Sequence, residues 1–314
     1  MAGHVSAAAR SAARSDAARA AGSYPAWIRS VREFFSRGSA IWGASLTAAV
    51  LILVAIGPLF AGYPPIDFVG APFESPSLDL PLGADIMGRD VLSRVLSGGT
   101  VILSLSALAT VLGVALGGLL GISAGYFKGV ADDLIMRTLD VLLAFPQTIL
   151  ALLFVSVLGS SFLLIAVLVA AIHAPQVARV IRAAALRVAG EDFVEYAKGI
   201  GTPPLKIMAR EIVPNVIGPL LVEGGLRFTY SIALIAGLSF LGLAQDPPAA
   251  NWGLMLNENR IGLAQNPWAV VVPVGLIAIL TVGVNLLTDA YGSWAARGNR
   301  PGAPQPAEII EGPL

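Results

Sequence analysis

Ser239 and His173 are the two residues of this sequence that could act together in hydrolysis. Ser239 lies in the stretch GLSFLG, and His173 lies in an earlier apolar segment. A serine nucleophile needs a neighbouring base, so the two could form the centre of an intramembrane serine protease. Such a centre is recognised by geometry, and the sequence spacing does not specify one. The interpretation we favour is a buried His173 that bonds to a backbone carbonyl. Ser239→Ala should leave function nearly intact if the chain is not such a protease.

Metal and nucleotide chemistry lack the residues they need. The 314 residues include no cysteine and only two histidines, His4 and His173, so the sequence contains no cluster of imidazole or thiolate ligands. Its three lysines are Lys128, Lys198 and Lys206, and none follows the glycine of a GxxxxGK[ST] phosphate-binding loop. We therefore expect no cofactor bound by this chain, and any ATP hydrolysis belongs to another subunit.

The segment EYAKGIGTPPLKIMAREIVPN, residues 195–215, concentrates charge between two apolar regions. Glu191 and Asp192 precede it and favour the positive end of a helix dipole. Lys198 lies near the end of this first helix, and Gly201 can take the left-handed conformation that terminates it. One face of the helix carries three apolar side chains, Phe193, Ala197 and Ile200.

A second helix is expected to follow. Thr202 can cap it, with Pro203 at its first position, where a missing N–H costs nothing. Pro214 marks its end, because the residue before a proline resists the helical conformation. Its apolar positions lie opposite two basic residues: Leu205, Met208 and Ile212 against Lys206 and Arg210. This helix, elbow and helix predict a surface for docking a protein, and a helix lying on anionic lipid is the alternative.

Glu223 and Arg227 are the charged residues of the apolar stretch 212–245. An ionisable group at the centre of a bilayer costs about 2.5–3.5 kcal/mol, so the pair should face protein or water. Four residues apart, they share a helix face and can neutralise each other. The alternative is that they line a path through the membrane.

Membrane-spanning helices must position all of these residues. The chain is 56% hydrophobic and 13% charged, whereas soluble domains carry about 25% charged residues. Each span needs about 20 apolar residues, because lipid cannot satisfy backbone polar groups. We predict an all-α integral membrane protein with six spans, the third and fourth folded about 159–161. Their limits are 41–62, 100–124, 134–158, 162–183, 217–243 and 270–292.

Basic residues predict the orientation. With a cytoplasmic N-terminus, 16 of the 20 Lys and Arg residues fall in cytoplasmic segments and three in outer ones, so both termini should be cytoplasmic. We expect a flexible cytoplasmic tail at 1–37, a six-span domain at 38–295 with the charged loop at 186–215, and a loose tail at 296–314. The Ala- and Arg-rich first 26 residues lack the apolar core of a secretory signal, and an organelle transit peptide is the alternative to a tail.

A ridge of glycines follows one face of the second predicted span. Gly113, Gly117, Gly121 and Gly125 recur at steps of four, which lets another backbone approach closely. The ridge is typical of helix packing within a bundle. A helix that slides or that contacts another subunit is the alternative.

Several motifs together resemble a known family. Glu195-Tyr196-Ala197, with Gly201 six residues and Pro214 nineteen residues after the Glu, resembles the EAA loop of the inner-membrane permeases of binding-protein-dependent ABC importers. Three further segments look like the second permease of the dipeptide, oligopeptide and nickel branch, and the resemblance covers about residues 40–295. They are PLGADIMGRDVLSRVLSGG at 81–99, DVLLAFP at 140–146 and LSFLGLAQDPPAANWGLML at 238–256.

The resemblance assigns a role to the charged loop. In that family the loop is the coupling helix that seats in a groove of a cytoplasmic ATPase. Glu195 and Ala197 match the acid and the second alanine, Gly201 the elbow and Pro214 the closing proline. Tyr196 departs from the pattern, since alanine is usual there. Leu205 and Lys206 on the second helix are our further candidates for groove contacts.

The resemblance also implies partners and location. The chain would pair with a homologous permease in a bacterial inner membrane, surrounded by lipid, with two ATPase subunits that use ATP and Mg and an extracytoplasmic substrate-binding protein. Its balanced charge gives no sign of nucleic-acid binding. Dipeptides or oligopeptides are the expected substrates, and chelated nickel or another small solute is the alternative.

The outer loop, 63–97, is the expected face for the binding protein. The candidate residues are the four charged ones at its end, Asp85, Arg89, Asp90 and Arg94. The alternative is an amphipathic helix whose residues Val91, Leu92, Val95 and Leu96 rest on lipid at the outer interface.

Overall fold

The computed structural model describes residues 32–244 and 250–298, and within them the regular secondary structure is helical, with two isolated β-bridges in the loop before Val91. The all-α prediction is confirmed. The elements are α3 Gly38–Ile56, η1 Gly57–Phe60, α4 Val91–Phe127, α5 Gly129–Leu143, α6 Gln147–Leu158, α7 Phe162–Val188, α8 Asp192–Gly199, α9 Pro204–Ile207, the π-helical turn η2 Met208–Ile212, α10 Val213–Phe240, α11 Trp252–Asn259, η3 Arg260–Gly262 and α12 Trp268–Gly298.

Within the described residues, five helices are long and apolar enough to cross a membrane without a break. They are Gly38–Phe60, Val91–Phe127, Phe162–Val188, Pro204–Phe240 and Trp268–Ala296. The turn predicted at 159–161 is present, since Gly159 has φ +95° and the Ser161 hydroxyl accepts the Leu164 N–H of the next helix at 3.3 Å. These helices make the chain a multi-pass membrane protein.

The third predicted span, 134–158, is not one helix. It is divided between α5 and α6, whose axes differ by 81° across the break at residues 144–146. Pro146 explains the break, because it lacks an N–H and disfavours the helical conformation of the residue before it. Six spans therefore result only if this bent pair crosses as one.

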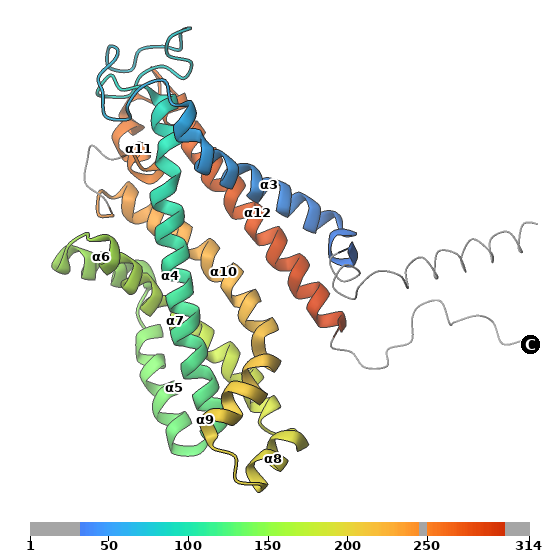
Figure 1. The fold of residues 1–314 in the computed structure, drawn as a ribbon. Coiled ribbons are helices and arrows are strands. Elements are labelled where there is room, and N and C mark those ends of the chain that lie inside the picture. Colours follow the sequence, from blue (N-terminus) through green and yellow to red (C-terminus); the bar gives the residue numbers. More distant parts are fainter. Residues whose placement is uncertain (1–31, 245–249, 299–314) are drawn as a thin grey trace, which may run out of the picture.

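The helices pack around α4, which runs through the centre of the bundle (Figure 1). α7 and α10 lie against α4, and α3 lies beside α12, which in turn packs on α10. α8 and α9 lie at one end of the bundle, called here the elbow end. The opposite end, called the cap, comprises residues 61–90 with α11 and η3.

The glycine ridge of α4 packs on α7 of the same chain. A Cβ added at Gly117 or Gly121 would lie 2.5 Å from the carbonyl oxygen of Ala174 or Ala178, respectively. Glycine is therefore needed where the two backbones meet. This is the packing role predicted for the ridge, and α7 occupies the face that a sliding or subunit contact would have used.

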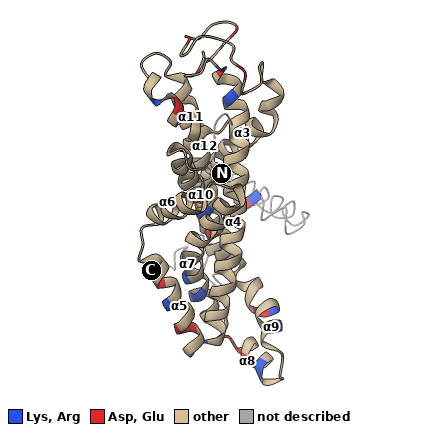
Figure 2. Ribbon diagram, turned by 90° about the vertical axis from the view of Figure 1, so that its left-hand side faces the viewer, with Lys and Arg blue, Asp and Glu red and all other residues tan. Residues whose placement is uncertain are grey.

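Two ion pairs attach α5 to α7. Asp132 binds the guanidinium of Arg182, and Asp140 accepts a hydrogen bond from Arg179 at 2.5 Å. Otherwise, most charged residues lie towards the two ends of the bundle, and a few lie at mid-height beside α10 (Figure 2). This distribution suits a bundle whose middle lies in lipid.

The predicted tails lie mostly outside the described residues. Within 32–37, which we expected to be flexible, Arg37 donates to the carbonyl of Ala290 in α12 at 3.1 Å, and the Phe34 ring stacks edge-on against Trp294. The tail boundary is therefore earlier than predicted. At the other end, α12 continues to Gly298.

Candidate functional site

The elbow closes α8 as the sequence predicts. Gly201 has φ +76°, its N–H donates to Lys198 at 3.0 Å, and the Thr202 N–H donates to Ala197 at 3.0 Å. These two bonds form a Schellman motif, in which a left-handed residue satisfies the last carbonyls of a helix. Thr202 thus terminates α8 and does not cap the next helix, which begins at Pro204 with Pro203 as its cap.

Pro214 does not end the second helix, contrary to the prediction. α9, η2 and α10 form one helix from Pro204 to Phe240, and the residue before the proline, Val213, has helical φ −52° and ψ −49°. The π turn at Met208–Ile212 widens the helix where the proline ring would otherwise meet the carbonyl four residues earlier. The elbow is therefore joined rigidly to the fifth span.

Apolar and aromatic side chains of the elbow are exposed. Tyr196 is 70% and Leu205 is 75% exposed, and Phe193 and Ile200 are exposed beside them. Val194, Ile207 and Ile212 are instead fully buried. Leu205 and Ile212 therefore do not share a face as predicted, because the π turn between them shifts the helical repeat. The elbow presents an apolar surface that a protein partner can cover.

The four charged residues assigned to a docking face at the cap are buried. Asp85, Arg89 and Arg94 are 0% exposed and Asp90 is 3% exposed. A docking surface needs accessible side chains, so this assignment is wrong for these four residues. The lipid-facing alternative also fails, because Val91 and Val95 are buried within the bundle.

An ion cluster holds the cap together. The Arg89 Nε donates to Asp85 at 2.7 Å, and Glu258 of α11 accepts from both Arg89 and Arg94 at 2.8 Å. Arg94 also pairs with Asp85. The cluster joins the loop before α4 to α11. Sequence reasoning missed Glu258, because that residue lies outside every motif.

Asp90 has a different role, which is to begin α4. Its carboxylate accepts the N–H groups of Leu92 at 3.3 Å and Ser93 at 2.8 Å. Because this cap starts the helix at Val91, α4 begins nine residues before the predicted limit of 100. Trp252 then locks α11 on this part of α4, as its ring N–H donates to the Val95 carbonyl at 2.8 Å.

Comparison with known proteins identifies the family. Residues 117–298 match the model of the family described as "Binding-protein-dependent transport system inner membrane component". The chain belongs to this family. It is thus the membrane component of a transport system and not a catalytic subunit, and membership implies work with an ATPase and a substrate-binding protein.

Curated relatives of this transport component agree with the match. The glutathione transport system permease protein GsiD of Pectobacterium atrosepticum is 37% identical over 69% of this chain and 72% of its own. A protein of Brucella ovis named as a peptide permease is 35% identical over 83% of this chain and 87% of its own. The family resemblance predicted from the motifs is confirmed.

Glu223 and Arg227 form an ion pair in this inner membrane component. The Arg227 Nε lies 3.2 Å from a Glu223 carboxylate oxygen, and the side chains are 11% and 8% exposed, respectively. Arg227 also donates to Gln176 of α7 at 3.3 Å and lies over the Tyr230 ring. This geometry supports mutual neutralisation within the bundle.

Ser239 and His173 do not form a catalytic pair in the described part of the permease. The Ser239 hydroxyl and both His173 ring nitrogens are buried without a hydrogen-bond partner there, so His173 also lacks the carbonyl partner we expected. Ser239 lies directly beneath Gly253 of α11, where an added Cβ would be 2.5 Å from the Ser239 Cβ. Its small side chain is explained by this packing.

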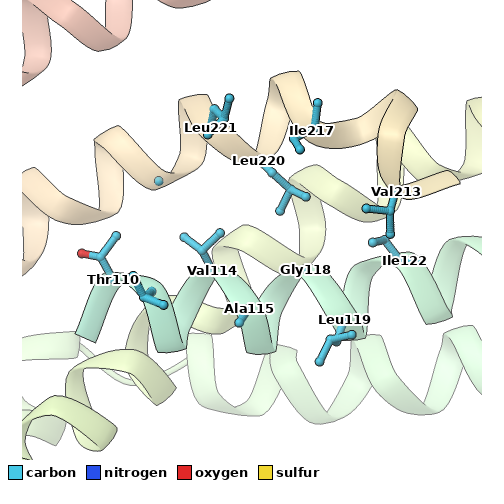
Figure 3. A pocket seen from close by; sticks show the side chains of 12 residues that line it. Thr110, Val114, Ala115, Gly118, Leu119, Ile122, Val213, Ile217, Leu220 and Leu221 are labelled. Atoms are coloured by element: carbon cyan, nitrogen blue, oxygen red, sulfur yellow. The ribbon is translucent and has the colours of Figure 1, made fainter. Parts of the chain in front are cut away.

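An apolar groove of about 560 Å³ lies between parts of α4 and α10 in the permease (Figure 3). Val114 and Leu220 point towards each other across it, and Thr110 lies at one end. Its lining residues are too apolar to bind a charged solute unaided. The groove needs lipid or another helix to cover it.

Proposed function

We propose that this chain is one of two homologous permease subunits of an importer for dipeptides or oligopeptides. The observation that carries the proposal is the exposed apolar elbow, which is held at the end of a helix that continues into the bundle. An exposed apolar surface of this kind is covered by a partner. Family membership and the names of the relatives supply the class of transporter and of substrate.

The partner at the elbow is a cytoplasmic ATPase. Tyr196 and Leu205 enter a groove of that subunit, and Glu195, Ala197 and Lys206 contact its rim. Gly201 fixes the angle between α8 and α9, and the unbroken helix through Pro214 carries the ATPase movement to the fifth span. Two ATPase subunits supply the ATP and Mg, one beneath each permease.

The orientation follows from the same assignment. The elbow and both termini lie in the cytoplasm of a bacterium, which the excess of basic residues in those segments supports. The cap is then extracytoplasmic and meets the substrate-binding protein through exposed residues such as Phe68 and Leu78. Glu223 and Arg227 border the substrate path where α10 meets α7, while remaining paired.

Co-purification tests the proposal. A tag on this chain should recover an ATPase from detergent-solubilised membranes. Glu195→Lys should lose it by reversing a charge at the contact, and Gly201→Pro by preventing the left-handed φ of +76°. Asp289→Lys makes the same charge reversal at an exposed residue of α12, and this variant should still recover the ATPase. If the wild-type chain recovers no ATPase, or both elbow variants recover it at the wild-type level, the proposed coupling is wrong.

A further inference from the structure

α8 has an inner face as well as the exposed face that meets the ATPase. Val194 is fully buried, and Lys198, four residues later on the same face, places its ammonium 5.0 Å from the centre of the Tyr126 ring. This distance is within the range of a cation–π interaction. The inner face therefore contacts a defined residue of another helix.

That residue belongs to α4, which is distant in sequence. Tyr126 is at the elbow end of α4, whereas the chain neighbours of α8 are α7 and α9. One buried apolar cluster joins all of these elements. Its members are Ile122 and Tyr126 of α4, Val177, Ile181, Ala184 and Ala185 of α7, Ala189, Val194 of α8, Ile207 of α9, Ile212 and Val216.

α4 extends from this cluster to the cap. Its 37 residues span about 55 Å at ~1.5 Å per residue. At the far end Asp90 caps the helix, and Arg94 is bound to Asp85 and Glu258 in the ion cluster. A displacement of Tyr126 along the helix axis is therefore transmitted to the cap, because close packing transmits strain.

We propose that Val194 and Lys198 are positioning residues that pass the movement of α8 directly to α4, and through α4 to the cap. This route is parallel to the continuous helix from α9 into α10 and rests on the proposed ATPase coupling. It links the site of ATP-driven movement to the opposite face of the membrane without passing through α10.

The absence of cysteine in this chain allows a sharp test. Met87→Cys places a single thiol in the cap, at a residue that is 46% exposed. The tagged complex is treated with a fluorescent maleimide, with and without Mg-ATP and vanadate, and labelling of this chain is read from its gel band. The rate at which maleimide labels this thiol should change when nucleotide is added, provided that Lys198 is present.

Lys198→Met should abolish that change while ATPase recovery and ATP hydrolysis remain. A loss of coupling of this kind should reduce the nucleotide-dependent change in labelling rate by about two- to thirty-fold. Lys198→Arg and Tyr126→Phe should retain it, because each keeps a cation over an aromatic ring. The double variant Lys198→Met with Tyr126→Leu should lose no more of the nucleotide response than either single variant, because the two residues act through one contact. Arg137→Met, which removes an exposed charge from α5, is the control.

Two results would overturn the inference. One is a nucleotide response in Lys198→Met that equals the wild type, and the other is a wild-type cap that does not respond at all. Both leave the proposed function standing if Glu195→Lys still loses the ATPase. Lys198 remains exposed although its ammonium lies over Tyr126, so Lys198→Met should keep the fold, and the ATPase recovery and ATP hydrolysis of that variant check this.

Discussion

Apart from Asp90, whose carboxylate accepts backbone N–H groups, the buried charged residues of the described chain lie close to an opposite charge. Asp85 and Glu258 face Arg89 and Arg94 in the cap, and the four charges sum to zero. Glu223 and Arg227 repeat the arrangement inside the bundle. Burial of an ion is tolerated only with such compensation, so losing one partner costs far more than losing the pair.

We predict that Arg94→Met strongly destabilises the cap. Removing one cation leaves Asp85 and Glu258 facing a single arginine in a buried site, which costs about 3–5 kcal/mol. Thermal unfolding of the purified protein should show a lower midpoint. Arg260→Met, at an exposed residue of the same cap, is the matched control, and an equal effect of the two substitutions would contradict the prediction.

We predict that the charges of Glu223 and Arg227 can be exchanged. Glu223→Arg or Arg227→Glu alone places two like charges one helical turn apart and should reduce uptake of a labelled peptide mixture. The double exchange restores opposite charges and should recover uptake. Failure of the double variant would mean that the two residues have separate roles in the path.

At the scale of elements, close approach of α4 and α7 depends on missing side chains. We predict that Gly121→Ala lowers the free energy of unfolding by about 1–3 kcal/mol, because the new Cβ would lie 2.5 Å from the Ala178 oxygen. Chemical denaturation in detergent measures this. Gly275→Ala in α12 has no atom within 4 Å of the new methyl group and should change stability little. Equal changes in the free energy of unfolding of the two variants would contradict the packing argument.

The sequence predicts elements well where local chemistry decides them. Gly201 and the turn at 159–161 follow from conformational preference, and the spans follow from apolar length. Prolines are harder to interpret. Pro146 breaks a helix and Pro214 does not, because a π turn precedes the second, and that turn has no sequence signature.

The misassigned residues fail for a different reason. Asp85, Arg89 and Arg94 look like a charged surface until Glu258, which is distant in sequence, is placed among them. Ser239 is a candidate nucleophile by sequence alone, whereas in the structure it packs against Gly253. Which side chains a long-range contact buries depends on tertiary structure, and pattern and propensity carry no information about it.

At the scale of the whole molecule, the two ends should be accessible from opposite sides of the membrane. We predict that a membrane-impermeant maleimide labels Leu78→Cys in intact spheroplasts and labels Leu205→Cys only after permeabilisation. Both side chains are exposed, and the chain has no cysteine of its own. The reverse pattern would invert the proposed orientation, and labelling of both in intact spheroplasts would contradict a spanning bundle.

The length of α4 explains how both ends can be reached from water. The helix spans about 55 Å, whereas the hydrocarbon core of a bilayer is about 30 Å thick. Some 25 Å of this helix therefore lies beyond the lipid tails. The cap at one end and the elbow at the other are both placed where water and partner proteins can approach, while the ion cluster stays buried inside the cap.

The ion cluster also sets an order for biogenesis. Glu258 is made 169 residues after Arg89, and chains grow at about 5–20 residues per second. The two arginines of the cap therefore wait about 8–34 s for their second carboxylate after they leave the ribosome. During that interval the loop before α4 lacks this ion-pair partner, so truncation before α11 should leave a chain whose incomplete cap is a target for proteases.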